Sequence, residues 1–199
     1  MEIVLLAINC ARKITALSMM LYVLLKNILF SLELKSVKSK ALDFYEIRGL
    51  RLSDLRAFIK AYTVCGGGGL SLFNKTLYVF SCRKLVLVAV AKPAGVSEII
   101  GMDMFYSNAR DFKERTIHEG FVGVSPSVRG RGVATELRKC AIAHFSKNKF
   151  SGISSRISLI NHASLSSAKK LGFLPVEQYF DQETQEDRYY LIRPLEARK

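Results

Sequence analysis

The segment GFVGVSPSVRGRGVATELRKC, residues 120–140, constrains the fold most, because two glycines join a predicted strand to a predicted helix. Gly130 and Gly132 let the backbone bend so that successive N–H groups face one concavity. The following helix leaves the N–H groups of its first turn unpaired, at the positive end of its dipole. With Arg129 and Arg131 beside it, this turn predicts an anion-binding cradle, most naturally for a diphosphate. The alternative is a tight strand-to-helix turn with solvated arginines.

Positive charge is concentrated around this turn. The chain of 199 residues carries 30 Lys and Arg against 17 Asp and Glu, a net charge of +13. Residues 129–170 hold nine of the basic residues and one acidic residue, so +8 of that charge lies in one stretch. A local field of this strength calls for an anionic partner. Nucleic acid is not expected, because a nucleic-acid-binding tail is more often a terminal run of like charges.

The four cysteines indicate neither a metal site nor a disulfide framework, because no two of them have CxxC or CxxxC spacing. We therefore expect no metal and a reducing, cytoplasmic setting. Cys140 lies in an apolar helical pattern and is expected to be a small core residue rather than a nucleophile.

The first forty residues form an apolar appendage. Apolar residues recur at helical spacing from 14 to 32, which predicts a helix within residues 3–32. The longest apolar run without charge, residues 14–25, is too short to cross a bilayer, and a longer span would include Lys26 and Glu33. We expect this helix to cover apolar surface: on its own domain, on a second copy in a homodimer, or as a peripheral contact with a membrane.

From residue 41 the pattern alternates between strands and helices. The four glycines at 66–69 are not followed by Gly-Lys-Ser/Thr, so they predict a flexible linker and not a phosphate loop. Pro126 is expected to end a strand, and Ser53 to cap a short helix. The predicted strands are residues 41–50, 85–92, 99–107, 118–124, 151–160, 176–180 and 188–192, and the further helices are 54–61, 131–146 and 163–171. We expect the strands at 85–92 and 99–107 to form a hairpin with its loop at residues 93–96, and a polar loop to follow it.

At the glycine turn the chain resembles the GNAT superfamily of N-acetyltransferases. The pyrophosphate loop of that superfamily is Arg/Gln-x-x-Gly-x-Gly/Ala, which Arg129, Gly132 and Ala134 match, after a Val-x-Pro at 124–126. A second element, residues 161–173, resembles the superfamily's asparagine, helix and Lys-Leu-Gly-Phe segment. The resemblance covers about four fifths of the chain.

The resemblance implies an α+β domain over residues 41–199, after the N-terminal helix and linker of residues 1–40. Its mixed β-sheet, flanked by helices, would be splayed between the strands at 118–124 and 151–160, with acetyl-CoA as cosubstrate in the gap. Coenzyme A also explains the concentrated positive charge, because it carries a diphosphate and a 3′-phosphate. The residues implied to bind it are Val124, Arg129, Gly130, Arg131, Gly132, Val133, Ala134, Thr135 and Asn161.

The sequence determines the catalytic residues less clearly than the cofactor-binding residues. Many relatives carry a carboxylate six residues before the valine of Val-x-Pro, and here that position is His118, with Glu119 beside it. Strict alternation places His118 on the face of Val124 and Glu119 on the other, unless a bulge re-aims them. We expect His118, or Glu119 acting through a water, to remove the acceptor's proton. The alternative is that both are polar residues at the end of a sheet.

The implied activity is acetyl transfer to a primary amine, on a protein N-terminus or on an amino sugar or other small metabolite. Many relatives have a tyrosine as general acid seven residues after the asparagine, whereas this chain has Ala168, as in the subgroup that includes ribosomal-protein N-acetyltransferases. The acid is therefore unassigned among Ser164, Ser167, Tyr189, Tyr190 and water. A CoA-binding regulatory or membrane-associated module with little turnover is the rival interpretation.

Overall fold

The computed structural model describes residues 2–92, 98–148 and 150–195, with the backbone alone for residues 2–13. Within these ranges the chain forms one eight-stranded sheet in the order β1-β2-β3-β4-β5-β6-β8-β7. The sheet is mixed, because β5 and β6 pair in parallel and the other neighbours are antiparallel. The strands are β1 (Lys40–Ala41), β2 (Tyr45–Gly49), β3 (Val86–Ala91), β4 (Ile99–Tyr106), β5 (Thr116–Val124), β6 (Gly152–Ser158), β7 (Leu174–Asp181) and β8 (Glu186–Pro194).

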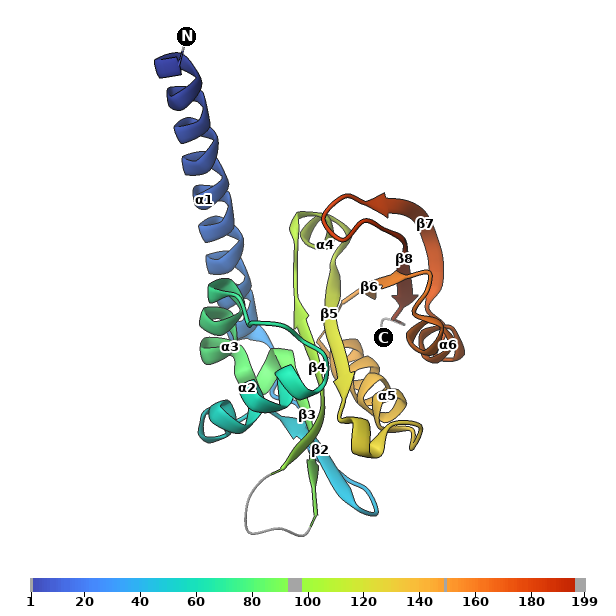
Figure 1. The fold of residues 1–199 in the computed structure, drawn as a ribbon. Coiled ribbons are helices and arrows are strands. Elements are labelled where there is room, and N and C mark those ends of the chain that lie inside the picture. Colours follow the sequence, from blue (N-terminus) through green and yellow to red (C-terminus); the bar gives the residue numbers. More distant parts are fainter. Residues whose placement is uncertain (1, 93–97, 149, 196–199) are drawn as a thin grey trace.

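Helices cover both faces of the sheet, with α2 and α3 on one face and α5 on the other (Figure 1). The central strands β3 and β4 are therefore buried on both sides and read as nearly continuous apolar runs. The helices are α1 (Glu2–Glu33), α2 (Leu55–Val64), α3 (Leu72–Leu85), α4 (Ala109–Glu114), α5 (Val133–Ser146) and α6 (His162–Lys170), with 3-10 turns η1 (Leu52–Asp54) and η2 (Pro126–Val128).

The sheet splays open between β5 and β6, as the resemblance implied. The two strands pair only from Thr116 opposite Gly152 to Glu119 opposite Ser155, although β5 continues to Val124. Beyond Glu119 the two strands separate (Figure 1). The backbone of the last residues of β5 therefore has no partner strand on that side among the described residues, and a cavity can form between the two strands.

Most predicted elements are confirmed with shifted ends. Residues 41–50 were expected to be one strand, but they contribute to two, because β1 and β2 form an antiparallel hairpin. The prediction that Ser53 caps a helix is wrong: the carboxylate of Asp54 instead accepts a hydrogen bond from the Arg51 N–H, 3.0 Å away. The predicted hairpin of β3 and β4 is present, while its expected loop at residues 93–96 lies outside the described residues.

Two helices were not predicted. The turn after β4 was expected to be a polar loop, and it contains α4, whose N-cap Asn108 accepts hydrogen bonds from the Arg110 and Asp111 N–H groups. The stretch after the four glycines forms α3, which Ser71 caps. The predicted N-terminal helix is confirmed as α1, which packs its last turns against α3 and extends beyond the domain (Figure 1).

Candidate active site

The glycine turn between β5 and α5 has the backbone that an anion cradle requires. Gly130 and Gly132 have φ of +76° and +79°, in the left-handed region that favours glycine. A Cβ added at either position would meet nothing within 4 Å, so the backbone angle, and not crowding, requires glycine there. Gly132 is also the N-cap of α5 and supplies no side-chain cap, which leaves the N–H groups of the first turn available to a ligand.

A cavity of about 600 Å³ opens in front of this turn, and we call it the loop cavity. It reaches from the end of β5, past the first turn of α5, to the start of α6. Eight of the nine residues that the resemblance implied to bind the cofactor line it: Val124, Arg129, Gly130, Gly132, Val133, Ala134, Thr135 and Asn161.

Arg131, the ninth, is placed differently. Its guanidinium lies over the ring of Phe44, 3.9 Å from the centroid, and Arg131 does not line the loop cavity. Arg129 does line it, and its Nε donates to the Val124 carbonyl oxygen at 3.3 Å, which ties the turn to the strand. Asn161 caps α6 by accepting a hydrogen bond from the Ser164 N–H at 3.1 Å, while it also lines the loop cavity. Capping and ligand contact are therefore compatible at Asn161.

A second cavity of about 530 Å³ lies between the separated strands, and we call it the splay cavity. Its walls come from residues 119–122 of β5, residues 155–158 of β6, and Glu186 and Arg188 of β8. The two cavities share four lining residues, which are Val122, Arg138, Asn161 and Ser164. A molecule in one cavity can therefore reach a molecule in the other at this junction.

A β-bulge on β5 decides which side chains face the junction. Phe121 pairs with Met104 and Glu119 pairs with Phe105, so Gly120 between them has no partner on β4. A bulge of this kind interrupts the regular alternation of a strand. Gly120 suits the position, because an added Cβ would lie only 2.5 Å from the ring of Tyr106.

The bulge makes the prediction from strict alternation wrong. Glu119, and not His118, lies on the α5 face of the sheet, where it bonds to Arg138 and lines the splay cavity. His118 lies on the opposite face, with its ring 5.1 Å from the ring of Tyr106. In the described part of the chain, His118 lines neither of the two cavities.

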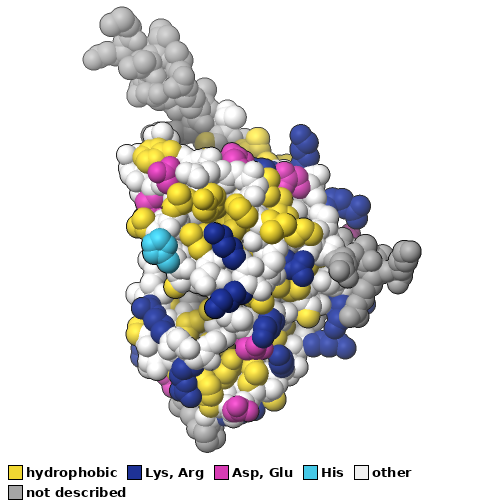
Figure 2. Space-filling model, turned by 90° about the vertical axis from the view of Figure 1, so that its right-hand side faces the viewer, with side chains coloured by type: hydrophobic (Ala, Val, Ile, Leu, Met, Phe, Trp, Pro, Cys, Tyr) yellow, Lys and Arg dark blue, Asp and Glu magenta, His cyan; other side chains and the backbone are white. Residues whose placement is uncertain are grey.

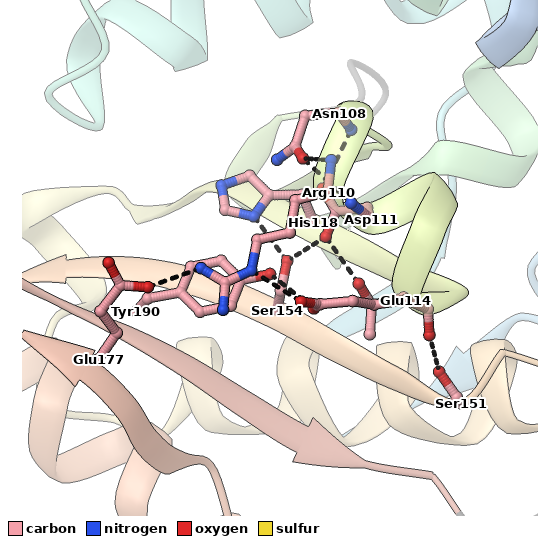
Figure 3. A network of polar contacts seen from close by, with 10 residues as sticks. Asn108, Arg110, Asp111, Glu114, His118, Ser151, Ser154, Glu177 and Tyr190 are labelled. Carbon is pink, nitrogen blue, oxygen red and sulfur yellow. Dashed lines mark hydrogen bonds and ion pairs between the residues drawn. The ribbon is translucent and has the colours of Figure 1, made fainter.

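His118 belongs to a buried polar network that joins three elements (Figure 3). Its side chain is almost fully buried, with 3% relative exposure, and its Nδ1 lies 2.7 Å from Ser154 Oγ on β6. Ser154 Oγ donates in turn to Asp111 Oδ1 of α4 at 2.6 Å. Burial lowers the pKa of His118 to about 4, so the ring is neutral at pH 7. This geometry indicates a structural role for His118 in holding α4 against the sheet.

Glu119 is held by a buried arginine that the sequence analysis did not single out. Arg138 donates from Nε to Glu119 Oε1 at 2.8 Å and from Nη2 to Oε2 at 2.7 Å, a bidentate ion pair. Ser155 Oγ donates to the same Oε2 at 2.9 Å, and Arg138 also donates to the carbonyl and hydroxyl of Ser164. One signal was available: Arg138 lies four residues after Ala134 and three before Ala141, on the apolar side of the predicted helix.

Asp103 is a second buried carboxyl group near this pair. It lies on β4 opposite Val122, is fully buried, and neither of its oxygens has a hydrogen-bond partner among the described residues. Burial, reinforced by the charge of Glu119, raises the pKa of Asp103 well above its usual value. The environment of Asp103 therefore favours the protonated, neutral form of its carboxyl group.

The candidate general acids differ in whether their side chains line a cavity. Ser164 and Ser167 line the loop cavity, whereas the Tyr190 hydroxyl points to Glu114 Oε2, 3.5 Å away on the α4 side. Tyr189 lines neither cavity in the described part of the chain. Ala168 is completely buried, so it offers no group to either cavity.

The outer surface of α5 and α6 is basic. Lys139, Lys169 and Lys170 are exposed there. Figure 2 shows Lys and Arg side chains spread over this face, with few acidic side chains between them. Part of the positive charge of residues 129–170 therefore lies on this surface, whereas Arg138 is buried in its ion pair with Glu119.

Comparisons with known proteins agree with this description. The model of the acetyltransferase (GNAT) family matches residues 55–173. No curated protein matches the sequence.

Among solved structures, the chain resembles a NatC complex bound to Gag peptide and CoA (20% identity, TM-score 0.67, covering 77% of this chain and 100% of that chain). It also resembles the ribosomal-protein-S5-alanine acetyltransferase of Vibrio fischeri (18%, 0.66, 81% and 99%) and the ribosomal-protein-S18-alanine N-acetyltransferase of Escherichia coli (15%, 0.60, 77% and 95%). At these identities the similarity establishes a shared fold.

Proposed function

Because the chain belongs to the acetyltransferase (GNAT) family, we propose that it transfers an acetyl group from acetyl-CoA in the loop cavity to a primary amine in the splay cavity. The observation that carries this proposal is the junction of the two cavities at Val122, Arg138, Asn161 and Ser164. A donor in one cavity and an acceptor in the other would be brought together there, which is the main requirement of a direct transfer.

The residues of the loop cavity fit a diphosphate. Gly130 and Gly132 leave open space where side chains would otherwise project, the N-terminus of α5 has no side-chain cap, and Arg129 stands beside it. Bound acetyl-CoA supplies a thioester, so that a C–N bond forms as its C–S bond breaks and the amine's proton passes in net to the thiolate.

Glu119 lines the splay cavity and is bonded to Arg138 at the junction, and we assign it the proton of the acceptor amine, taken through a water molecule. Arg138 and Ser155 position it, and Oε1, which accepts only the bond from Arg138 in the described part of the chain, keeps a lone pair for that water. A Glu119→Gln variant should lose at least 100-fold in kcat with an unchanged CoA dissociation constant. A parental kcat in a folded Glu119→Gln protein would show that the amine loses its proton elsewhere.

The acceptor is proposed to carry an anionic group, because the splay cavity contains a cation to which the described residues give no ion pair. Arg138 is neutralised by Glu119, and Arg188 lies 3.1 Å from Asp181. Arg156 of β6 is exposed and lines the splay cavity, and the described residues give it no ion pair. Its positive charge acts to lower the pKa of the neighbouring Tyr106, Tyr179 and His118. A carboxylate or phosphate on the acceptor would complete this site.

The test uses matched acceptors that differ only in this group. One pair is glucosamine and glucosamine 6-phosphate, and the other is two short peptides whose second residue is glutamine or glutamate. We expect the anionic member of one pair to have at least a tenfold higher kcat/KM, and the pair that responds identifies an amino sugar or a protein N-terminus. Equal rates within both pairs would overturn the proposed anionic acceptor.

Two arginine variants test which side chain recognises the anionic group of the acceptor. Arg156→Gln should remove most of the preference for the anionic acceptor, while Arg188→Gln in the same cavity is the control and should keep it, because Asp181 and Glu186 already neutralise Arg188. A preference that survives Arg156→Gln would assign recognition to another group.

The rival function, a CoA-binding module with little turnover, has its own signature. It predicts that the protein binds CoA but forms free CoA from acetyl-CoA no faster than the uncatalysed rate with every amine.

We also propose a cytoplasmic location, which three free cysteines support, namely Cys65, Cys82 and Cys140.

A further inference from the structure

The N-terminal helix is fixed to the domain in one orientation. Asn27 of α1 is buried, and its side-chain amide bonds to both the carbonyl and the N–H of Ser107, each at 2.7 Å. Lys84 of α3 donates from Nζ to the carbonyls of Ser31 and Leu32 at 2.7 and 3.0 Å, near the end of the helix. These contacts determine which side of α1 faces the domain and which side faces outward.

The outward side carries an apolar stripe that Ser18 interrupts, and the Ser18 hydroxyl donates to the Thr15 carbonyl at 2.9 Å. The six apolar side chains of the stripe recur every three or four residues over about 27 Å of helix, and each is 51–64% exposed. They are Ile14, Leu17, Leu21, Leu25, Leu29 and Leu32. An exposed apolar surface of this length, without a charged residue in it, marks an interaction site.

The one charge between Ile14 and Leu32 is turned away from this stripe. Lys26 points towards the domain, with its Nζ 4.3 Å from the ring centroid of Phe112 in α4 and 5.5 Å from that of Tyr22. The stripe is therefore free of charge along its whole length.

Lipid fits this surface better than a second copy of the helix. Met19, Met20 and Tyr22 are also largely exposed, and they point to other sides of α1, so the apolar surface wraps around the helix where it leaves the domain. A partner helix covers one stripe, whereas acyl chains and headgroups also cover the flanks. The helix is followed by Lys35, Lys38 and Lys40, and the chain carries +13, which favours an anionic surface.

The helix passes a simple test for crossing a membrane, but its docking argues against that arrangement. The segment Ile14–Glu33 is long and apolar enough to cross a membrane, with a mean hydropathy of 1.6, and only 11% of it is buried against the rest of the protein. Asn27, inside this segment, is bonded to Ser107 of the domain. A full crossing would pull the polar domain into the hydrocarbon.

We propose that α1 binds the surface of an anionic lipid bilayer, lying along it with the stripe from Ile14 to Leu32 inserted among the acyl chains. The domain then sits at the membrane surface, on the opposite side of α1. This proposal is independent of the acceptor of the enzyme.

The test is flotation of the full-length protein with vesicles of phosphatidylcholine alone or with 30% phosphatidylglycerol. We expect the wild-type protein to float with the anionic vesicles and to be released by carbonate. Leu21→Gln/Leu25→Gln should weaken binding more than tenfold. The control is Leu174→Gln/Val176→Gln, two equally apolar and exposed positions on β7, which should bind like the wild type.

Each other outcome contradicts the proposal. No flotation of the wild type, or equal loss in both double variants, would overturn lipid binding through α1. Resistance to carbonate would mean that α1 spans the bilayer. A dimer in light scattering that the Leu21→Gln/Leu25→Gln variant dissociates, without vesicle binding by the wild type, would assign the stripe to a second copy. Unchanged CoA affinity confirms that the variants are folded.

Discussion

Replacement of Arg138 by methionine should destabilise the protein strongly. Arg138 is 1% exposed and makes two charge-assisted hydrogen bonds to Glu119 and two bonds to Ser164. Without the guanidinium, Glu119 keeps only the bond from Ser155 and becomes an uncompensated buried charge. Breaking a buried ion pair in this way costs about 3–5 kcal/mol, which corresponds to roughly 6–20 °C in Tm for a domain of this size.

The assay is urea denaturation of four proteins: the wild type, Arg138→Met, Glu119→Leu, and the double variant. The double variant removes both charges and fills the space with apolar atoms, so its free energy of unfolding should return to within about 1–2 kcal/mol of the wild type. Arg138→Lys keeps the charge without the bidentate geometry and should lie between the wild type and Arg138→Met. A loss below about 1 kcal/mol in Arg138→Met, or additive effects in the double variant, would refute the argument that this pair is buried and coupled.

Two further predictions concern pH. The pKa of His118 is lowered from 6.5 to about 4, so the unfolded state binds a proton at a higher pH than the native state does. As the pH drops from 6.5 to about 4, the free energy of unfolding should therefore fall by about 1.4 kcal/mol per pH unit. Denaturation experiments should show a weaker pH dependence of stability for His118→Asn. Asp103 has its pKa raised above 3.8, so the native state holds its proton longer and stability is lost as the pH rises towards the raised value. Asp103→Asn should therefore gain Tm relative to the wild type at pH 8 but not at pH 4, and an equal difference at both pH values would show that the pKa of Asp103 is not raised in the native state.

The sequence contains enough information for the glycine turn and the order of the strands, because both depend on local patterns. The left-handed backbone at Gly130 and Gly132 follows from residue type, and the apolar strands β3 and β4 follow from burial on both faces. The helix α3 was missed because its residues show no clear apolar stripe, and only its cap Ser71 marks it.

The candidate site was predicted less completely, because its geometry depends on non-local pairing. The bulge at Gly120 exists only in the pairing of β5 with β4, and it moves Glu119 to the face where alternation placed His118. The partner of Glu119 is Arg138, nineteen residues later, and no spacing rule connects the two. A polar residue on the apolar side of a helix was the one local sign of this pair.

The most direct test of the central claim, that acetyl-CoA binds at the glycine turn, is calorimetry of CoA with two valine variants. Gly132→Val places a β-branched side chain at a φ of +79° and in front of the loop cavity, so the dissociation constant should rise more than tenfold, or about 1.4 kcal/mol. Gly68→Val in the linker, where an added Cβ would meet nothing within 4 Å, should bind CoA like the wild type. An unchanged dissociation constant in a folded Gly132→Val protein would contradict the claim.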